Sequence, residues 1–509
     1  MMRSIRARVF LGLLALFLVG PVRPARAVLL QNLRDSVQEF TLENGLRFLV
    51  VERHEAPVFS YTMCVDAGGV CEVPGLTGIA HMFEHMAFKG TESIGTTDYA
   101  AEKPALDAVD AAWDEVRAER LKGAAADSAR LRQLGAVFAK AQEAAQRFVV
   151  GNQFFSLLEQ NGAKDVNAFT ATDATCYQYD IPSNRLELWA RMEGDRLSRP
   201  VMREFYMERD VVRNERRMRL ESSAMGRFLE SLMTAAFMAH PYSHGFSNFA
   251  SDIEMFRRQD AREFFDRYYV ASNMTVALVG DVDAREVRRL AERYFSGVRR
   301  GPNPDPVTIV EPVHTAERRV LAEEDANPIV IVGWQGPAET DPDYAAAELL
   351  MQVLGGGRSS RLFERLVKKE KVATAASAGI GLPGSKYPNL VVTFAYVAAD
   401  QDPQRAEAVI HEEVARLIVE GPTAAELQKV KTEYLANQIR QLREPAELAL
   451  QLAMTDQGQG NWRRLFEHLD RIESVTAADL QRVARERFVK ARRTVGILSK
   501  KGTEEKAAS

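Results

Sequence analysis

Residues 78–88 read GIAHMFEHMAF and contain the pattern H-x-x-E-H, on which the whole interpretation of the chain depends. If this stretch is helical, His81 and His85 lie one turn apart on the same face, and Glu84 points toward the same region. The other residues are largely apolar, so three polar groups on a partly buried helix require partners. Two imidazoles, a further protein ligand and an open position are typical of a catalytic zinc site. The pattern inverts the more familiar order of zinc-protease residues.

The motif itself contains no third metal ligand, so another part of the chain must supply one. Glu208 and Glu215 are seven residues apart in a helix-like run and therefore lie on one helical face. An acidic, arginine-rich helix is ordinarily a solvated surface held by local ion pairs. The residues alone do not select Glu215 from the other acids of the chain.

The first 27 residues have the form of a secretory signal. Three arginines precede an apolar run over residues 9–20, and the small-residue site Ala25-Arg26-Ala27 predicts cleavage after Ala27. The run is too short to span a bilayer as a stable helix, and no later run is longer. We therefore expect an exported, periplasmic protein of a Gram-negative host, with no membrane span in the mature chain. An uncleaved anchor is the alternative.

Composition restricts the possible partners and redox chemistry. The signal contains five arginines and no acid, so the formal charge of −4 for the whole chain becomes −9 without it, which argues against a nucleic-acid partner. Three cysteines are too few for a disulfide framework. Cys64 and Cys71 either pair in an oxidising compartment or remain small core residues, and neither these nor Cys176 lies in a nucleophile motif.

The chain contains one structural plan twice. A strand-like run follows a proline at 56–61 and again at 327–332, and a helix leads into a strand at 273–278 and again at 493–498. The first interval is longer by about 52 residues, which indicates an insertion. Apolar residues at heptad-like spacing between about 102 and 150 predict an antiparallel helical hairpin there.

These observations predict an α+β fold of two homologous domains with largely antiparallel sheets and packed helices. The expected boundaries are a signal peptide (1–27), an N-terminal zinc-binding domain (28–296) with the helical insertion (about 102–150), a linker rich in proline (297–306), a C-terminal domain without the zinc motif (307–500) and a polar tail (501–509).

A set of motifs in a fixed order resembles the pitrilysin/insulinase family of inverzincin metallopeptidases. The resemblance covers essentially the whole mature chain and is greatest to the two-domain branch, which includes mitochondrial processing peptidases and bacterial periplasmic peptidases. The matching segments are His81–His85, Phe88–Thr91, Asp165–Thr170, the Glu208 and Glu215 pair, His240–Tyr242, Val279–Asp281 and Leu354–Phe363.

The resemblance implies a role for each matching residue. His81, His85 and Glu215 would bind one zinc ion per chain, Glu84 would be the general base, and Glu208 would orient the site. Asn167 and Ala168 match the family's edge strand, where a peptide substrate adds by backbone hydrogen bonds. Phe88 would line the pocket for the side chain after the cut bond, with plain core packing as the alternative.

The second half departs from the family pattern. Complete enzymes of the family carry an arginine and, seven residues later, a tyrosine that hold the substrate; here these positions are Val367 and Thr374. Relatives with this division of parts act beside a second subunit that supplies the arginine and tyrosine. We therefore expect the zinc-bearing half of a heterodimer.

Four other interpretations compete with the peptidase. Some relatives are non-catalytic structural subunits, although they usually lose the zinc residues. A metal-dependent amide hydrolase for small molecules fits the two-domain layout poorly. A second metal site at His240 and His244 lacks a third ligand, and Gly355–Gly357 lacks the lysine and serine of a phosphate loop, so it is expected to be a turn.

Overall fold

The computed structural model describes residues 25–245 and 248–501. The predicted signal peptide lies outside this range except for its last three residues, which begin helix α1 (Ala25–Asp35), and all but the first residue of the predicted tail lies outside it as well. Among the helices of the described ranges, none has the length and apolar character needed to cross a membrane.

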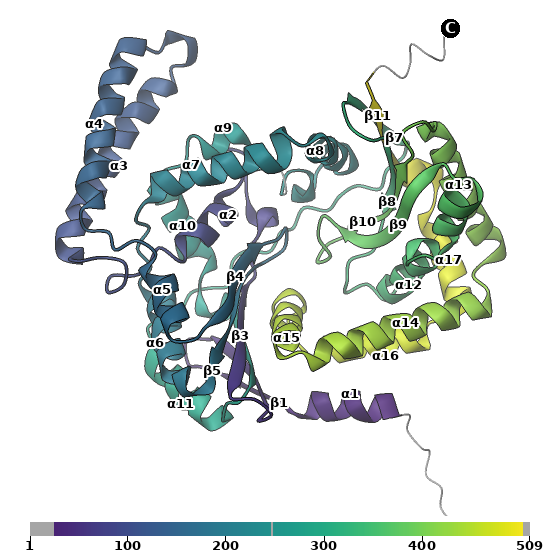
Figure 1. Ribbon diagram of the computed structural model, residues 1–509, viewed down its shortest axis with the longest axis horizontal. Coiled ribbons are helices and arrows are strands. Elements are labelled where there is room, and N and C mark those ends of the chain that lie inside the picture. Colours follow the sequence, from purple (N-terminus) through teal and green to yellow (C-terminus); the bar gives the residue numbers. More distant parts are fainter. Residues whose placement is uncertain (1–24, 246–247, 502–509) are drawn as a thin grey trace, which may run out of the picture.

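The fold is α+β, with two mixed and largely antiparallel sheets that are each accompanied by helices (Figure 1). The first sheet has the order β1-β2-β6-β3-β5-β4 and the second has the order β7-β11-β8-β10-β9. Their strands are β1 (Val37–Thr41), β2 (Arg47–Glu52), β3 (Val58–Val65), β4 (Lys164–Thr170), β5 (Thr175–Pro182), β6 (Met274–Gly280), β7 (Arg318–Glu324), β8 (Ile329–Gln335), β9 (Ala373–Leu382), β10 (Leu390–Val397) and β11 (Arg493–Lys500).

Apart from β1, the two sheets repeat one topology. In each, the first pair is parallel, β2 with β6 and β7 with β11, and all the following pairs are antiparallel. The inner strands β6 and β8 are almost continuously buried, as their apolar sequences require for strands covered on both faces. The strands β4 and β9 occupy equivalent edges of the two sheets.

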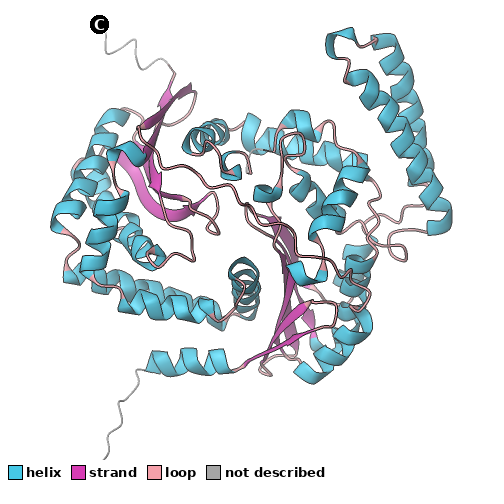
Figure 2. Cartoon of the chain, turned by 180° about the vertical axis from the view of Figure 1, so that it is seen from behind, coloured by secondary structure: helices cyan, strands magenta, loops and turns pink. Residues whose placement is uncertain are grey.

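Helices cover the sheets and join the two halves (Figure 2). Helix α15 belongs to the second half but packs against β3 and β6 of the first sheet, with Leu448 and Leu452 buried in the shared core. The helices of the first half are α2 (Ile79–Met86), α3 (Tyr99–Arg120), α4 (Ser128–Gln146), α5 (Gln153–Gln160), α6 (Leu186–Ser198), α7 (Phe205–Arg216), α8 (Ala224–Ala236), α9 (Ala250–Ile253), α10 (Arg258–Tyr268) and α11 (Ala284–Tyr294). Those of the second half are α12 (Tyr344–Gly355), α13 (Pro403–Glu420), α14 (Ala424–Arg443), α15 (Pro445–Gln459), α16 (Arg464–Ser474) and α17 (Ala477–Arg487).

Helices α3 and α4 form a hairpin that projects from the first half (Figures 1 and 2). The rings of Trp113 and Phe138 meet across its seam at 5.4 Å. At its base, the fully buried guanidinium of Arg203 is paired with Glu102 of α3 and donates a hydrogen bond to the carbonyl oxygen of Lys89. The hairpin is thereby anchored to the loop that follows α2.

The cysteine pairing differs from both alternatives that the sequence suggests. Cys64 forms a disulfide with Cys176, and Cys71 is free. Cys64 on β3 and Cys176 on β5 are direct partners in the sheet, with 4.2 Å between their Cα atoms, although 112 residues separate them. Cys71 lies beyond the end of β3 in a short 3-10 helix. The pairing of Cys64 with Cys71 is therefore wrong, because sheet register and not sequence distance selects the partner.

Candidate metal centre and peptide groove

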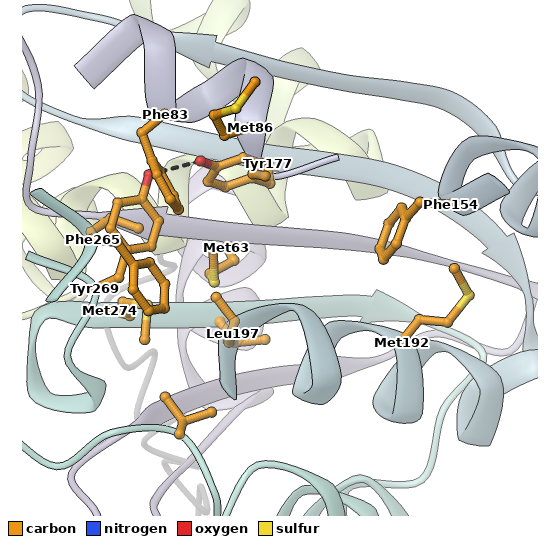
Figure 3. Close-up of a cluster of buried hydrophobic side chains, with 14 of the residues drawn as sticks. Met63, Phe83, Met86, Phe154, Tyr177, Met192, Leu197, Phe265, Tyr269 and Met274 are labelled. Carbon is orange, nitrogen blue, oxygen red and sulfur yellow. Dashed lines mark hydrogen bonds between the residues drawn. The ribbon is translucent and has the colours of Figure 1, made fainter. Parts of the chain in front are cut away.

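Helix α2 presents its polar residues to one side because its apolar residues are fixed in the core. Phe83 packs against Tyr269 with 4.3 Å between ring centroids, and Met86 and Tyr177 belong to the same buried cluster (Figure 3). The hydroxyls of Tyr177 and Tyr269 lie 2.7 Å apart (Figure 3). This packing leaves His81, Glu84 and His85 only partly buried, on the remaining face of the helix.

A buried carboxylate fixes the start of α2. The two carboxylate oxygens of Glu72 accept hydrogen bonds from the backbone nitrogens of Gly78 (2.8 Å) and Ala80 (2.9 Å). Burial of this side chain raises the pKa of Glu72 to about 8. Gly78 has a φ of 94°, a left-handed conformation that glycine adopts without strain. The motif therefore begins at a defined point and direction.

The structure brings together His81, His85 and Glu215. Oε2 of Glu215 lies 3.6 Å from Nε2 of His81 and 3.6 Å from Nε2 of His85. One donor atom from each residue lies within 4.8 Å of the other two. Among the residues that the structure describes, this is the one group of histidines, cysteines and acids with such spacing. Two imidazole nitrogens and a carboxylate oxygen are a donor set that fits zinc.

Charged neighbours surround the pair of histidines. Burial and the nearby His85 lower the pKa of His81 to about 4, which favours the neutral imidazole that a metal requires. Nδ1 of His85 lies 3.2 Å from Oε2 of Glu208, and this contact raises the pKa of His85 against the effect of its burial. Lys89 donates to the other oxygen of Glu208 at 2.5 Å. Glu208 thus orients His85, and Lys89 orients Glu208.

Glu84 is held from the edge strand. Thr170, the last residue of β4, donates a hydrogen bond from Oγ1 to Oε2 of Glu84 at 2.6 Å. Burial raises the pKa of Glu84, while the hydrogen bond from Thr170 and the charge of His85 oppose that increase. A raised pKa suits a carboxylate that accepts a proton near neutral pH.

His81, Glu84, His85 and Glu215 line a cavity of about 730 Å³. One wall is the end of β4 and the turn after it, and it includes Asn167 and Ala168. The lining also includes the end of α7, the short π-helix Arg217–Glu221 and the start of α8. Arg219 of this π-helix is largely exposed and forms an ion pair with Oε1 of Glu215. The proposed metal ligands, Glu84 and the two edge-strand residues Asn167 and Ala168 therefore share one cavity.

Three residues that the family resemblance singles out lie elsewhere. Phe88 is not among the residues that line the cavity; its ring stacks on Phe155 with 4.6 Å between centroids. Val367 packs against the core of the second half. Thr374, on β9, donates a hydrogen bond to the carbonyl oxygen of Tyr396. Neither Val367 nor Thr374 lines the cavity.

Comparisons with known proteins agree with this geometry. The family profile described as "Insulinase (Peptidase family M16)" matches residues 47–108, which include α2, and the profile "Peptidase M16 inactive domain" matches residues 256–434. The chain belongs to the insulinase family. The first profile lies within the first half and includes the motif, whereas the second begins just before α10 of the first half and continues to α14 of the second.

Relatives of this insulinase-family chain extend over most of its length. Zinc protease PqqE of Helicobacter pylori is 26% identical, over 89% of this chain and 90% of that protein. An uncharacterized zinc protease of Mycobacterium tuberculosis is 24% identical, over 92% of each protein. Subunit 1 of the mitochondrial cytochrome b-c1 complex of Bos taurus is 22% identical, over 62% of this chain and 54% of that protein.

Solved structures share the insulinase-family fold. A protease from Helicobacter pylori superimposes with a TM-score of 0.75 at 24% identity, over 91% of this chain and 99% of that one. The periplasmic protease PqqL of Escherichia coli has a TM-score of 0.68 at 17% identity, over 93% of this chain but 48% of its own. At these identities the likeness establishes the fold.

Proposed function

We propose that this chain is a zinc-dependent endopeptidase that acts on extended or unfolded peptides. His81, His85 and Glu215 would hold one zinc ion beside the cavity that their side chains line. Bound zinc would polarise the substrate carbonyl and lower the pKa of a bound water. The observation that carries the proposal is the approach of Oε2 of Glu215 to Nε2 of both histidines at 3.6 Å.

Glu84 is the general base in this proposal. Its carboxylate is adjacent to the histidine pair, and one of its oxygens is already occupied by Thr170. The other oxygen is left to accept the proton from the attacking water and to pass it to the leaving amine. Glu208 accepts a hydrogen bond from His85 and so fixes the ring whose other nitrogen binds the metal.

The substrate binds as an additional strand on β4. This strand is at the edge of its sheet, and Asn167 and Ala168 line the cavity beside the histidines. Pairing by main-chain hydrogen bonds requires an extended peptide and tolerates most side chains. An enzyme of this design acts on unfolded segments and not on folded domains.

A second subunit completes the active site. Val367 has no hydrogen-bond donor, the hydroxyl of Thr374 is bonded within its own sheet, and neither residue lines the cavity. A related subunit with an arginine and a tyrosine at these positions would supply the missing donors. The partnership is a heterodimer in which this chain contributes the metal.

Export to the periplasm of a Gram-negative host accords with the disulfide. Cys64 and Cys176 are joined in the buried centre of the first sheet, and such bonds persist in oxidising compartments. N-terminal sequencing of the exported protein should find Val28 or a residue within one or two positions of it. A membrane-bound protein that still begins near Met1 would contradict this proposal.

The alternative is a non-catalytic structural subunit of a larger complex. The similarity to a subunit of the cytochrome b-c1 complex favours it, whereas the intact set of His81, Glu84, His85 and Glu215 disfavours it. The two functions are separated by incubating the zinc-loaded protein and its Glu84→Gln variant with an unstructured peptide, with and without the related subunit. If the chain is an enzyme, the peptide should be cleaved and cleavage should depend on Glu84. If it is a structural subunit, the peptide should not be cleaved.

A further inference from the structure

Thr170 connects the peptide-binding strand to the proposed general base. It ends the edge strand β4, where it is the direct partner of Thr175 on β5. Its hydroxyl lies 2.6 Å from Oε2 of Glu84, whose helix packs against this strand. The contact therefore joins two elements whose relative position determines whether base and substrate meet correctly.

Glu84 has no other hydrogen-bond donor of comparable geometry among the described residues. A carboxylate held by a single donor can rotate once that donor is removed. Because Thr170 occupies Oε2, Oε1 remains for the proton of the attacking water. The hydroxyl thus selects which oxygen performs the chemistry and fixes its direction.

We propose that Thr170 is a positioning residue that couples peptide pairing on β4 to the orientation of Glu84. The inference rests on the proposed peptidase function. A peptide that adds to the free edge of β4 fixes the strand, and the strand then holds Glu84 through the hydroxyl of Thr170. Thr170 lines the same cavity as the metal donors, and the contact by which it reaches the motif is its hydrogen bond to Glu84, so it acts through Glu84.

The test compares Thr170→Val, which removes the hydroxyl and keeps the shape, with Thr170→Ser, which retains the hydroxyl. A matched control is Thr393→Val in the second half, where a buried strand threonine donates to the carbonyl oxygen of Val332. The kcat and KM for an unstructured fluorogenic peptide are measured with the related subunit present, together with the zinc content of each variant.

Thr170→Val should lower kcat by about ten- to a hundredfold, with KM and zinc content close to those of the wild type. Thr170→Ser should retain most of kcat, and Thr393→Val should match the wild type. A Thr170→Val enzyme as fast as the wild type, or a Thr170→Ser enzyme as slow as Thr170→Val, would overturn the inference. Failure of the proposed function is distinguishable, because the wild type itself would then cleave nothing.

A measurement without catalysis tests the same contact. In zinc-free protein, Thr170→Val should melt at a lower temperature than Thr170→Ser, because only serine retains the bond to Glu84. In a Glu84→Ala background this difference should disappear, since the acceptor is absent. A difference that persists undiminished without Glu84 would show that the threonine serves packing alone, and the coupling would be rejected.

Discussion

The two halves of the molecule repeat one strand order, but the helices at equivalent positions in the two halves carry different side chains. In the first half, the helix after β3 is α2, with His81, Glu84 and His85 on its free face. In the second half, the helix after β8 is α12, whose sequence YAAAELLMQVLG is buried along almost its whole length. The scaffold is shared, and a few polar side chains on one copy distinguish the candidate metal centre from a packed core.

The comparison also shows what a polar helix requires from its surroundings. Each ionisable group of the motif on α2 has a neighbour that accounts for it: Thr170 for Glu84, Glu208 for His85, and Glu215 for both histidines. Helix α12 packs against β9 and β10 mainly through apolar residues, and its one acidic side chain, Glu348, is paired with His468. A functional site in a repeated fold therefore depends on contacts from several elements and not on the motif alone.

The largest expected effect is the loss of peptide turnover when an acid on α2, but not one on α12, is replaced. Glu84→Gln should reduce turnover of an unstructured peptide by about a hundred- to ten-thousandfold, because it removes the proton acceptor. Zinc content should remain that of the wild type. The control is Glu348→Gln on α12, where the carboxylate contacts His468 at 2.8 Å and turnover should not change. Equal loss in both variants would indicate a general effect on folding.

The next largest effect on turnover concerns the arginine and tyrosine that the second half lacks. Adding a related subunit that carries the arginine and tyrosine should raise turnover by about a hundred- to a thousandfold, because a donor for the developing oxyanion is then present. The measurement is peptide cleavage by this chain with and without that subunit. If the chain alone is as fast as the mixture, the heterodimer should be abandoned in favour of a donor from this chain or from a homodimer.

The disulfide should stabilise the first half, which contains all three cysteines of the chain. Replacing both Cys64 and Cys176 with alanine should lower the free energy of unfolding by about 2–5 kcal/mol, since the bond closes a long loop. Urea denaturation measures this loss. Cys71→Ala is the control, because Cys71 is unpaired. If the double variant is as stable as the control, the bond does not form in the native protein.

The smallest effect is a pair of opposite pH dependences. Burial raises the pKa of Glu72 in the first half to about 8, so its stabilising contribution is complete below the ordinary carboxyl pKa of about 4.5 and is lost as pH rises through 8. In the second half burial opposes the shift, but hydrogen bonds from His411 and Arg319 lower the pKa of Glu407 to about 2. Its contribution is complete above pH 4.5 and is lost as pH falls through 2.

Melting temperatures of Glu72→Gln and Glu407→Gln across this pH range check both signs. Relative to the wild type, Glu72→Gln should gain stability between pH 4.5 and 8. The melting temperature of Glu407→Gln should be closest to that of the wild type at the lowest pH. Parallel pH profiles for the wild type and Glu72→Gln would mean that Glu72 titrates normally in the folded protein.

Much of the scaffold could be predicted from sequence because local patterns encode it. The motif on α2, the seven-residue spacing of Glu208 and Glu215, and the repeated strands all follow from periodicity or from family resemblance. The α+β fold is confirmed by the strand order and by the solved relatives. The helical hairpin is present at α3 and α4, where heptad-like spacing predicts it.

The contacts that complete the site could not be predicted in the same way. Thr170 reaches Glu84, and Cys176 reaches Cys64, only because the sheet register places distant residues beside each other. In the sequence Arg219 is one of many arginines, and only its place on the π-helix brings it to Glu215. Such pairs leave no periodic signal in a single sequence, since they arise from the packing of whole elements.

A zinc titration of the metal-free protein shows whether the first half, and it alone, holds a metal. The wild type should bind close to one zinc per chain, and Glu215→Gln should weaken that binding by more than about tenfold. The matched control is Glu426→Gln on α14 of the second half, where the carboxylate is paired with Arg361 and zinc binding should not change. Wild-type affinity in Glu215→Gln, or a wild type that binds no zinc, would rule out the proposed metal centre.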